Sequence, residues 1–332
     1  MALRLVFCGT PEFALPSLRR LIADSNFQVE AVITQPDRPR GRGQHVAASP
    51  VKEFALASGL YLYQPEKMRS ESAELFLKRI APDAVVIIAY GQIIPANLLT
   101  IPRFGWINLH ASLLPKYRGA APINWAIANG EKVSGLTTMQ VDAGMDTGPI
   151  LMQHEMEILP EETAPELSHR MAEAGAPLVA DSLMDLANGT ISPRAQDSAQ
   201  ATRAPLLKKE HGLVDWNLMA VEIANRIRGF EPWPGAYAFF RGQHCQIWGR
   251  EAGEGSADTQ ANQIAGEAEQ ASNTSAPAAG AILIERDSVV VACGAKTLLA
   301  LEAVKLEGRG KVSARDFVNG ARLKAGEKFA SE

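Results

Sequence analysis

Hydrophobic runs alternate with amphipathic segments along the first half of the chain. Short apolar runs have the length of buried strands at residues 3–8, 29–34, 60–63 and 84–89. Apolar positions recur at helical spacing in residues 12–23, 50–58 and 71–80. Strands that are apolar on both faces and alternate with helices are typical of a parallel sheet covered on both sides. We therefore predict a Rossmann-like, mostly parallel α/β domain.

The pattern changes in the second half of the chain. Strand-like segments at 134–140 and 149–158 precede a long helical pattern at 164–187. Residues 188–206 are rich in Ser, Ala, Pro and Gln, which predicts a linker. Short helices are predicted at 217–228 and 314–319, and short strands at 236–240, 243–249, 281–285, 288–292 and 297–304. Short strands with frequent turns favour a small OB-like β-barrel.

These patterns predict two domains and one insertion. The predicted domains are residues 1–187 and 207–332, joined by the linker at 188–206. Residues 251–279 lack the aromatic and β-branched content that a core needs, so we predict a flexible acidic insertion there. A chain of 332 residues is long enough for this division, because single cores usually stop growing near ~250–300 residues.

Composition adds limits on the class of protein. The chain is 46% hydrophobic and 21% charged with a net charge of -4, which is ordinary for a globular protein and gives no global bias toward nucleic acid. Its N-terminus shows neither a signal peptide nor a membrane-spanning run, so we expect a cytoplasmic protein without a membrane partner. The cysteines Cys8, Cys245 and Cys293 show no CxxC spacing, which argues against disulfides and a zinc site.

Charge becomes informative only locally. Residues 207–331 carry 15 Lys and Arg against 15 Asp and Glu, but five of those acids fall in the insertion. The remainder has 15 bases against 10 acids. A small barrel with excess positive charge is a plausible surface for a polyanion, although a merely solvated face fits this signal equally well.

Ligands of parallel sheets bind at the carboxyl ends of the strands. Three loops occupy such positions: one at Thr10-Pro11, one at Tyr90-Gly91-Gln92, and one that starts at His110. Neither GxGxxG nor GxxxxGK[ST] occurs in the sequence, which argues against dinucleotide and P-loop nucleotide sites.

The third loop carries polar side chains on alternate residues. An apolar, strand-like segment at 105–109 leads into Asn108, His110 and Ser112, and the two-residue period of a strand would turn these side chains to one side. A structural histidine is the alternative interpretation of His110. Downstream, a glycine-punctuated loop from Val141 to Gly148 holds Asp142 and Asp146.

These residue types suit transfer of an acyl or formyl group between nitrogens. Asn108 offers amide donors to an oxyanion, and His110 can carry a proton. Asp146 would hold His110 charged if its loop folds back onto the strand ends. Ser112 lies in no GxSxG elbow, so direct transfer is favoured over a covalent intermediate. We expect no metal site, since the cluster His154-Glu155-Met156-Glu157 fits the wet face of a strand.

The combined pattern Asn108-x-His110-x-Ser112-Leu-Leu-Pro115 and Asp142-x-Gly144-x-Asp146-Thr-Gly148 resembles the formyltransferases that use 10-formyltetrahydrofolate. The resemblance implies a Rossmann-like catalytic domain, an OB-like domain that binds tRNA, and 10-formyltetrahydrofolate as formyl donor. It implies that Asn108, His110 and Asp146 are catalytic. It also implies folate contacts at Ser112, Leu113, Leu114, Pro115, Tyr90, Gly91, Val141 and Asp142.

Basic residues gain a role from the same resemblance. The glycine-interleaved loop at 37–44 carries Arg38, Arg40 and Arg42, which would contact acceptor-stem phosphates. Lys208 and Lys209 precede the predicted barrel and are also expected to bind tRNA. The implied partner is initiator tRNA charged with methionine, and we expect a monomer. Two alternatives stay open: a formyltransferase for an amino sugar or glycinamide nucleotide, and a folate- or RNA-binding protein without catalysis.

Overall fold

The computed structural model describes residues 2–40, 45–252, 277–284, 288–324 and 326–331. The chain forms two compact units, which are considered separately below. The first unit comprises Met1–Ile123, Val133–Ile158 and Glu166–Pro205. The second comprises Asn124–Lys132, Leu159–Pro165 and Leu206–Glu332. The predicted boundaries at 187 and 207 stay a prediction.

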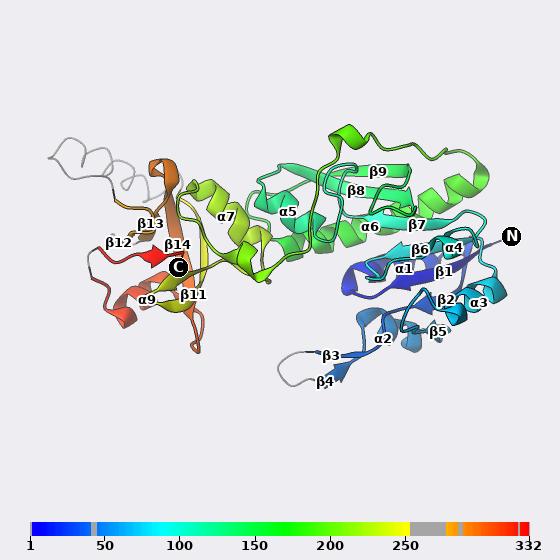
Figure 1. The fold of residues 1–332 in the computed structure, drawn as a ribbon, viewed down its shortest axis with the longest axis horizontal. Helices are drawn as coiled ribbons and strands as arrows, with labels where there is room; N and C mark the ends of the chain where they lie inside the picture. Colours follow the sequence, from blue (N-terminus) through cyan, green and yellow to red (C-terminus); the bar gives the residue numbers. More distant parts are fainter. Residues whose placement is uncertain (1, 41–44, 253–276, 285–287, 325, 332) are drawn as a thin grey trace. The chain divides into compact units, whose positions relative to one another are not determined.

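The first unit is built on one sheet of strand order β5-β2-β1-β6-β7-β8-β9 (Figure 1). Its strands are β1 (Leu3–Gly9), β2 (Phe27–Ile33), β5 (Leu62–Tyr63), β6 (Ala84–Ile88), β7 (Trp106–His110), β8 (Val133–Gln140) and β9 (Ile150–Glu157). The pairs from β5 to β7 are parallel, whereas β7-β8 and β8-β9 are antiparallel. The predicted mostly parallel, Rossmann-like sheet is therefore confirmed.

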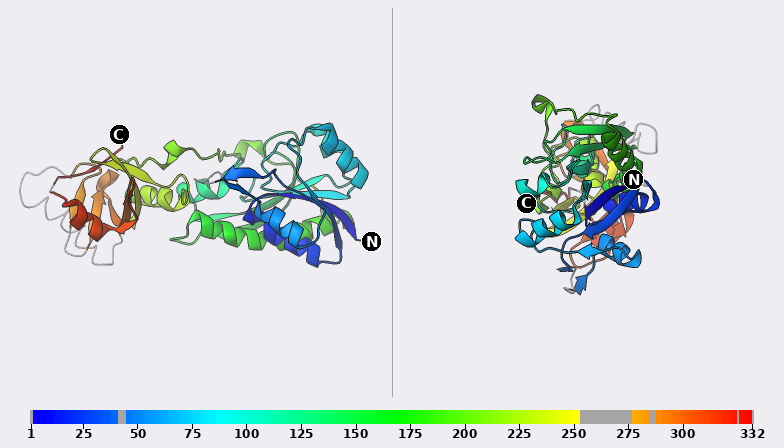
Figure 2. Two further views of the ribbon diagram at one scale, coloured as in Figure 1. Left: turned by 90° about the horizontal axis from the view of Figure 1, so that it is seen from below. Right: turned by 90° about the vertical axis from the view of Figure 1, so that its right-hand side faces the viewer.

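Helices cover both faces of this sheet, as Figure 2 shows. On one face, Ala73 and Leu77 of α3 (Glu71–Ile80) pack in a core cluster with Val6 of β1. On the other face lies α6 (Ala164–Asn188), whose Ser182 is hydrogen-bonded to Thr138 of β8 at 2.6 Å. Burial on both faces explains why the strands read as continuous apolar runs.

The remaining helices of this half follow the predicted ranges or are short additions to them. They are η1 (Glu12–Ala14), α1 (Leu15–Ala23), α2 (Pro50–Ala57), α4 (Ala96–Leu99), α5 (Pro122–Ala128) and η2 (Ser198–Gln200). Ser49 and Ser70 cap α2 and α3 by accepting hydrogen bonds from the backbone N–H of Lys52 and Ala73. The sequence pattern did not predict α4 and α5, which have only 4 and 7 residues.

A two-stranded ribbon lies in the chain between β2 and α2. Its strands β3 (Arg38–Arg40) and β4 (His45–Ala47) pair antiparallel. Asp37 immediately before β3 forms an ion pair with Lys52 of α2. Hydrogen bonds from Lys52 and Gln64 lower the pKa of the Asp37 carboxyl. These contacts fix the start of β3 to α2 and to the chain after β5.

The second unit is an antiparallel sheet of order β12-β13-β14-β11-β10-β16, with β15 paired to β14, which is consistent with the predicted OB-like fold. Its elements are η3 (Lys209–Gly212), α7 (Ala220–Gly229), β10 (Tyr237–Phe240), β11 (Gln243–Glu251), β12 (Ile282–Ile284), β13 (Val289–Ala292), η4 (Gly294–Lys296), β14 (Leu298–Leu306), β15 (Val312–Ser313), α9 (Ala314–Ala321) and β16 (Phe329–Ala330). Its core includes the aromatic rings of Trp216, Phe240, Phe317 and Phe329. Most of the predicted acidic insertion, residues 253–276, lies outside the described residues.

Two earlier segments of the chain belong to the second unit, which the sequence did not predict. Asn124 of α5 donates a hydrogen bond from Nδ2 to the Gly229 carbonyl at the end of α7, at 2.8 Å. A Cβ on Gly229 would lie 2.8 Å from the backbone N of Ala128, so only glycine permits this close approach. Arg228 donates to the Glu162 carbonyl at 3.0 Å. Burial lowers the pKa of the Arg228 guanidinium.

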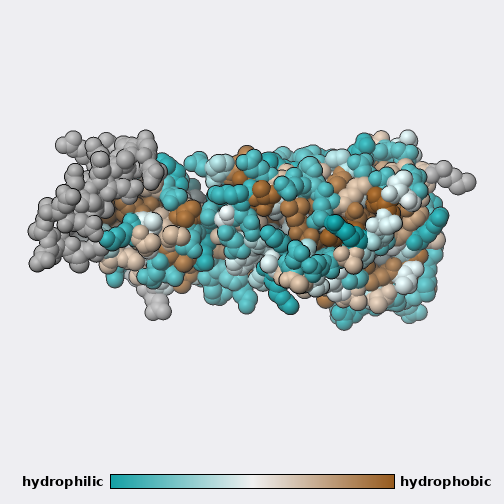
Figure 3. Space-filling model, turned by 90° about the horizontal axis from the view of Figure 1, so that it is seen from above, coloured by the Kyte–Doolittle hydropathy of each residue, from teal (hydrophilic) through white to brown (hydrophobic). Residues whose placement is uncertain are grey.

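The cysteines are unpaired and buried, and the surface is mainly hydrophilic on the face drawn in Figure 3. Cys8, Cys245 and Cys293 are buried free thiols, as predicted, and burial raises the pKa of Cys245 and Cys293 to about 12. Among the described residues, every helix falls short of the length and apolarity that a membrane crossing requires. On the face drawn in Figure 3, hydrophilic residues predominate and hydrophobic residues form smaller groups between them.

Helix α3 offers a direct test of the core. Leu77 is fully buried and Leu75 of the same helix is 59% exposed. Leu77→Ala should lower the free energy of unfolding by about 2–5 kcal/mol, because it leaves a cavity against the sheet. Leu75→Ala should change it by less than about 1 kcal/mol. Chemical denaturation of both variants measures this, and equal losses would contradict the packing described.

Candidate active site

Strand β7 carries polar side chains from the core to the edge of the sheet. Trp106, Asn108 and His110 lie on one face of the strand because side chains alternate. Trp106 is 1% exposed and its Nε1 donates to the Leu98 carbonyl at 2.8 Å. Asn108 follows, half-buried, and its amide has no hydrogen-bond partner among the described residues. Both N–H groups of Asn108 are therefore available to a ligand.

His110 is held in one orientation by the backbone of the following loop. Its ring is 6% exposed and Nε2 lies 2.9 Å from the Tyr117 carbonyl oxygen. A carbonyl oxygen only accepts, so Nε2 carries the hydrogen in this contact. Nδ1 then holds the lone pair of the neutral ring, and it faces Asp146 Oδ2 at 3.8 Å. Nδ1 is thus the nitrogen that can take up or return a proton.

The loop between β8 and β9 brings Asp146 to this place. Asp142 shapes the loop by accepting hydrogen bonds from the Gly144 N–H at 3.0 Å and the Thr147 hydroxyl at 2.8 Å. Asp146 adopts a φ of +54°, a left-handed conformation that aspartate tolerates better than most residues. Its Oδ2 also accepts the Gly119 N–H at 2.8 Å. The structure therefore brings Asp146 and His110 together as the sequence predicted, with Asn108 on the same strand face.

The predicted folate segment after β7 is partly used for internal contacts. Ser112 is fully buried, and its Oγ donates to the Lys116 carbonyl at 2.6 Å. Leu114 is buried and donates its N–H to Thr137 Oγ1 at 3.1 Å. Leu113 and Pro115 are half-buried, so they present the accessible part of this segment. Val141 and Asp142 are half-buried in the facing loop.

Tyr90 and Gly91 follow β6 and differ in accessibility. The Tyr90 ring is 2% exposed, and burial raises the pKa of its phenol. Its hydroxyl is buried without a hydrogen-bond partner among the described residues. The Tyr90 carbonyl accepts hydrogen bonds from Thr10 Oγ1 at 3.2 Å and Gln35 Nε2 at 3.0 Å. Gly91, with a φ of +86°, lines an open cavity instead.

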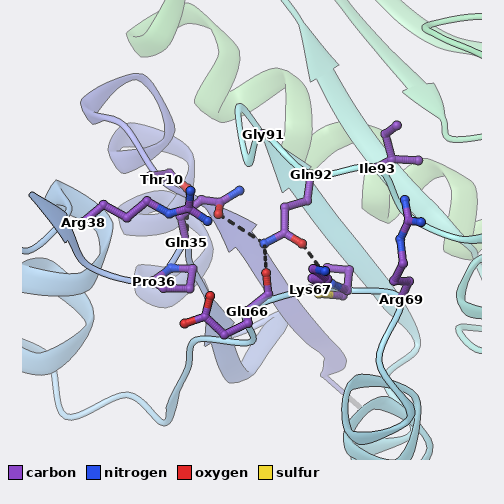
Figure 4. A pocket seen from close by; sticks show the side chains of 11 residues that line it. Thr10, Gln35, Pro36, Arg38, Glu66, Lys67, Arg69, Gly91, Gln92 and Ile93 are labelled. Atoms are coloured by element: carbon purple, nitrogen blue, oxygen red, sulfur yellow. Dashed lines mark hydrogen bonds between the residues drawn. The ribbon is translucent and has the colours of Figure 1, made fainter.

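This cavity of about 830 Å³ lies where β1, β2 and β6 end, the position expected for a ligand of such a sheet (Figure 4). Gln92 spans it, since its Nε2 donates to Gln35 Oε1 at 3.1 Å and its Oε1 accepts the Met68 N–H at 2.9 Å. The lining residues are Thr10, Gln35, Pro36, Arg38, Glu66, Lys67, Met68, Arg69, Gly91, Gln92 and Ile93. Sequence reasoning found Thr10, Arg38 and Gly91 but missed Lys67 and Arg69, which belong to no motif.

The structure describes four of the five predicted tRNA-binding residues, Arg38, Arg40, Lys208 and Lys209. Arg38 is exposed and lines the cavity. The backbone of Arg40 pairs with His45 in the ribbon, and Arg42 lies outside the described residues. Lys208 and Lys209 are exposed on the second unit. Among the described residues, no group of three or more His, Cys, Asp or Glu side chains is placed to hold a metal ion.

Comparisons with known proteins identify the family of this chain. Residues 3–183 match the family model described as formyl transferase, and residues 206–322 match the formyl transferase C-terminal domain. A methionyl-tRNA formyltransferase from Solibacter usitatus is 49% identical, and the alignment covers 98% of each chain. The protein of the same name from Koribacter versatilis is 47% identical with the same coverage.

Solved structures share the fold at much lower identity. An N-formyltransferase from Helicobacter canadensis, in complex with folinic acid and dTDP-3-aminofucose, superposes with a TM-score of 0.60 at 19% identity, covering 91% of this chain and 99% of that one. HypX from Aquifex aeolicus in complex with tetrahydrofolic acid has a TM-score of 0.60 at 14% identity, covering 99% and 49%. These likenesses concern the fold. On the evidence of both family models and the full-length relatives, this chain belongs to the formyl transferase family.

Proposed function

We propose that this chain transfers a formyl group from 10-formyltetrahydrofolate to the amino group of methionine on initiator tRNA. The observation that carries the proposal is the similarity over nearly the full length, both units included, to relatives named methionyl-tRNA formyltransferase. The arrangement of Asn108, His110 and Asp146 supplies the chemistry that such a transfer requires.

Asn108 would stabilise the charge that develops on the formyl oxygen. When the amine attacks the formyl carbon, the carbonyl oxygen becomes an oxyanion. The Asn108 amide is uncharged, has free N–H donors and sits on a strand held on both sides by β6 and β8. A donor fixed by sheet pairing needs little reorganisation during the reaction.

His110 would move the proton. The new C–N bond forms as the amine loses a proton to His110 Nδ1, and the same proton then passes to the folate nitrogen as the old C–N bond breaks. The carboxylate of Asp146, 3.8 Å from Nδ1, stabilises the imidazolium between these steps. Tyr117 keeps Nε2 occupied, so the ring presents only Nδ1.

The folate donor would lie against the two loops that flank these residues. We propose contacts at the accessible Leu113 and Pro115, with Ser112 and Leu114 shaping the segment from behind. Gly91 and the Val141-Asp142 turn complete the enclosure, and the buried Tyr90 supports Gly91 through its backbone.

The tRNA would be held by positive charge on each unit. We propose that the cavity with Arg38, Lys67 and Arg69 receives phosphates near the acceptor end. We propose that Arg40 and Arg42 also contact phosphates, and that Lys208 and Lys209 do so on the second unit. In this proposal residues 1–187 catalyse and residues 207–332 bind tRNA. A monomer acting in the cytoplasm stays a prediction.

Product analysis tests the proposed function. The protein is incubated with 10-formyltetrahydrofolate and, separately, with methionyl initiator tRNA, an amino sugar nucleotide and glycinamide ribonucleotide. Formylated methionyl-tRNA as the main product supports the proposal. A formylated amino sugar or glycinamide nucleotide would show that the acceptor is wrong. No product with any acceptor would favour a binding protein without catalysis.

The Asn108 amide gives the first catalytic prediction. Asn108→Ala should lower kcat about 10²–10³-fold, the usual cost of losing an oxyanion donor. Asn108→Asp, which matches the side chain in size, should lower it at least as much because it places negative charge beside the oxyanion. KM for methionyl-tRNA should stay within about threefold. Steady-state formylation kinetics measures kcat and KM, and single-turnover formylation measures the chemical step. An unchanged rate in either variant would exclude this role of Asn108.

His110 gives the second. His110→Ala should lower kcat about 10²–10⁴-fold through loss of proton transfer. His154→Ala is the control, since His154 is exposed on β9 and has no role in the proposed chemistry. If both variants kept the wild-type rate, His110 would be a structural histidine.

Arg38 tests tRNA binding apart from chemistry. Arg38→Ala should raise KM for methionyl-tRNA several-fold, leave kcat nearly unchanged, and reduce the slope of log KM against log salt by about one. Arg79→Ala, on the exposed end of α3, should change neither quantity. Steady-state kinetics over a range of salt concentrations measures the effect. Identical behaviour of the two variants would remove Arg38 from the binding surface.

A further inference from the structure

One side chain that was not predicted as a site residue contacts both loops of the site, the loop after β7 and the loop between β8 and β9. Gln196 lies in the segment after α6 that the sequence predicted as a linker, and it is half-buried in the first unit. Its Nε2 donates to the Asp146 carbonyl at 2.9 Å and to the Gly148 carbonyl at 2.7 Å. Its Oε1 accepts from Arg118 Nε at 3.0 Å and Nη2 at 2.7 Å.

The chemistry of these contacts requires an amide in one orientation. Two carbonyl oxygens face one end of the Gln196 side chain and two N–H groups of Arg118 face the other end. A carboxylate would turn an acceptor toward the carbonyls and leave them without donors. An amide flipped by half a turn would fail at both ends.

The two partners of Gln196 adjoin the two groups that define His110. Asp146 lies 3.8 Å from Nδ1, and its backbone carbonyl is one of the oxygens that Gln196 holds. Arg118 directly follows Tyr117, whose carbonyl receives the Nε2 hydrogen. Gln196 therefore connects the loop that carries Asp146, next to Nδ1, with the loop that carries the Tyr117 carbonyl, next to Nε2.

Backbone contacts of the same segment act in parallel. Thr202 Oγ1 accepts the Tyr117 N–H at 2.8 Å, and the Thr202 carbonyl accepts the Arg118 N–H at 2.9 Å. The Ala204 N–H donates to the Arg118 carbonyl at 2.7 Å. A Cβ on Gly119 would lie 2.4 Å from the Ala204 oxygen, so glycine is needed there. These contacts fix one loop, and Gln196 holds the other loop against it alongside the hydrogen bond from the Gly119 N–H to Asp146 Oδ2.

We propose that Gln196 is a positioning residue for formyl transfer: its amide holds the backbone of the Asp146 loop, and together with the Gly119–Asp146 hydrogen bond it keeps the carboxylate near His110 Nδ1. This rests on the proposed function, because it assigns both groups to proton transfer. Gln196 touches no reacting atom. Its loss would let the loop of Asp146 move away from the imidazole and weaken the support of the charged ring.

Kinetics and NMR of His110 test the proposal together. Gln196→Ala should lower kcat about 10–100-fold, as loss of a supporting contact commonly does, with KM for methionyl-tRNA within about threefold. The imidazole nitrogen-15 resonances of His110, assigned with His110→Asn, should differ from those of the wild type because the Asp146 carboxylate no longer lies at a fixed distance from Nδ1. Gln200→Ala is the matched control, since Gln200 in the same segment is exposed and bonds only Asp197.

A second variant separates positioning from general loss of structure. Gln196→Glu keeps the size of the side chain and the Arg118 partner but presents acceptors to the two carbonyls. Its rate relative to the wild type should rise as pH falls, because a protonated carboxyl regains one donor. A constant ratio across pH, or unchanged His110 resonances in both Gln196 variants, would overturn the proposal. If the wild type formylates no methionyl-tRNA, the proposed function fails, while the NMR comparison still decides the role of Gln196.

Discussion

Asp146 Oδ2 accepts a hydrogen bond from the Gly119 N–H at 2.8 Å, and the relation between the two loops of the site depends on this contact. One loop follows β7 and carries the carbonyl that orients His110. The other joins β8 to β9 and supplies the carboxylate. The loop after β7 starts at His110, opposite Thr137, whereas the β8–β9 loop starts beyond Gln140, which pairs with Ile107 near the other end of β7. Asp146 therefore has to reach back along β7, and its hydrogen bond to Gly119 fixes it there.

Two of the proposed catalytic side chains lie on a strand, and the groups that orient His110 lie on loops. Asn108 and His110 stand on a strand paired on both sides, so their backbone positions are fixed by the sheet. The loops are irregular, and Tyr117 and Asp146 both adopt positive φ values, +58° and +54°. Such conformations persist at functional sites when surrounding contacts over-determine them. Here those contacts come from Gln196 and Thr202, which belong to a segment with little regular structure of its own.

The sequence predicted the features that rest on local pattern. The strands of the first sheet, α3, α6 and the alternation of Asn108 and His110 follow from periodicity alone. Two residues whose place depends on contacts far along the chain, Gln196 and Asn124, were not predicted. Gln196 lay in an apparent linker, and its meaning comes from Arg118, 78 positions away. Asn124 joins the second unit through a bond to Gly229 that spans 105 positions. Short elements such as α4 and β16 carry too few residues for a period to show.

The central structural claim is that His110 is preset with hydrogen on Nε2 and a lone pair on Nδ1 toward Asp146. Nitrogen-15 NMR of the imidazole of His110, in the neutral form of the free protein, measures this most directly. We expect Nε2 to be the protonated nitrogen, because it faces the Tyr117 carbonyl. Hydrogen on Nδ1 instead would contradict the account, since that nitrogen could then not accept the proton of the attacking amine.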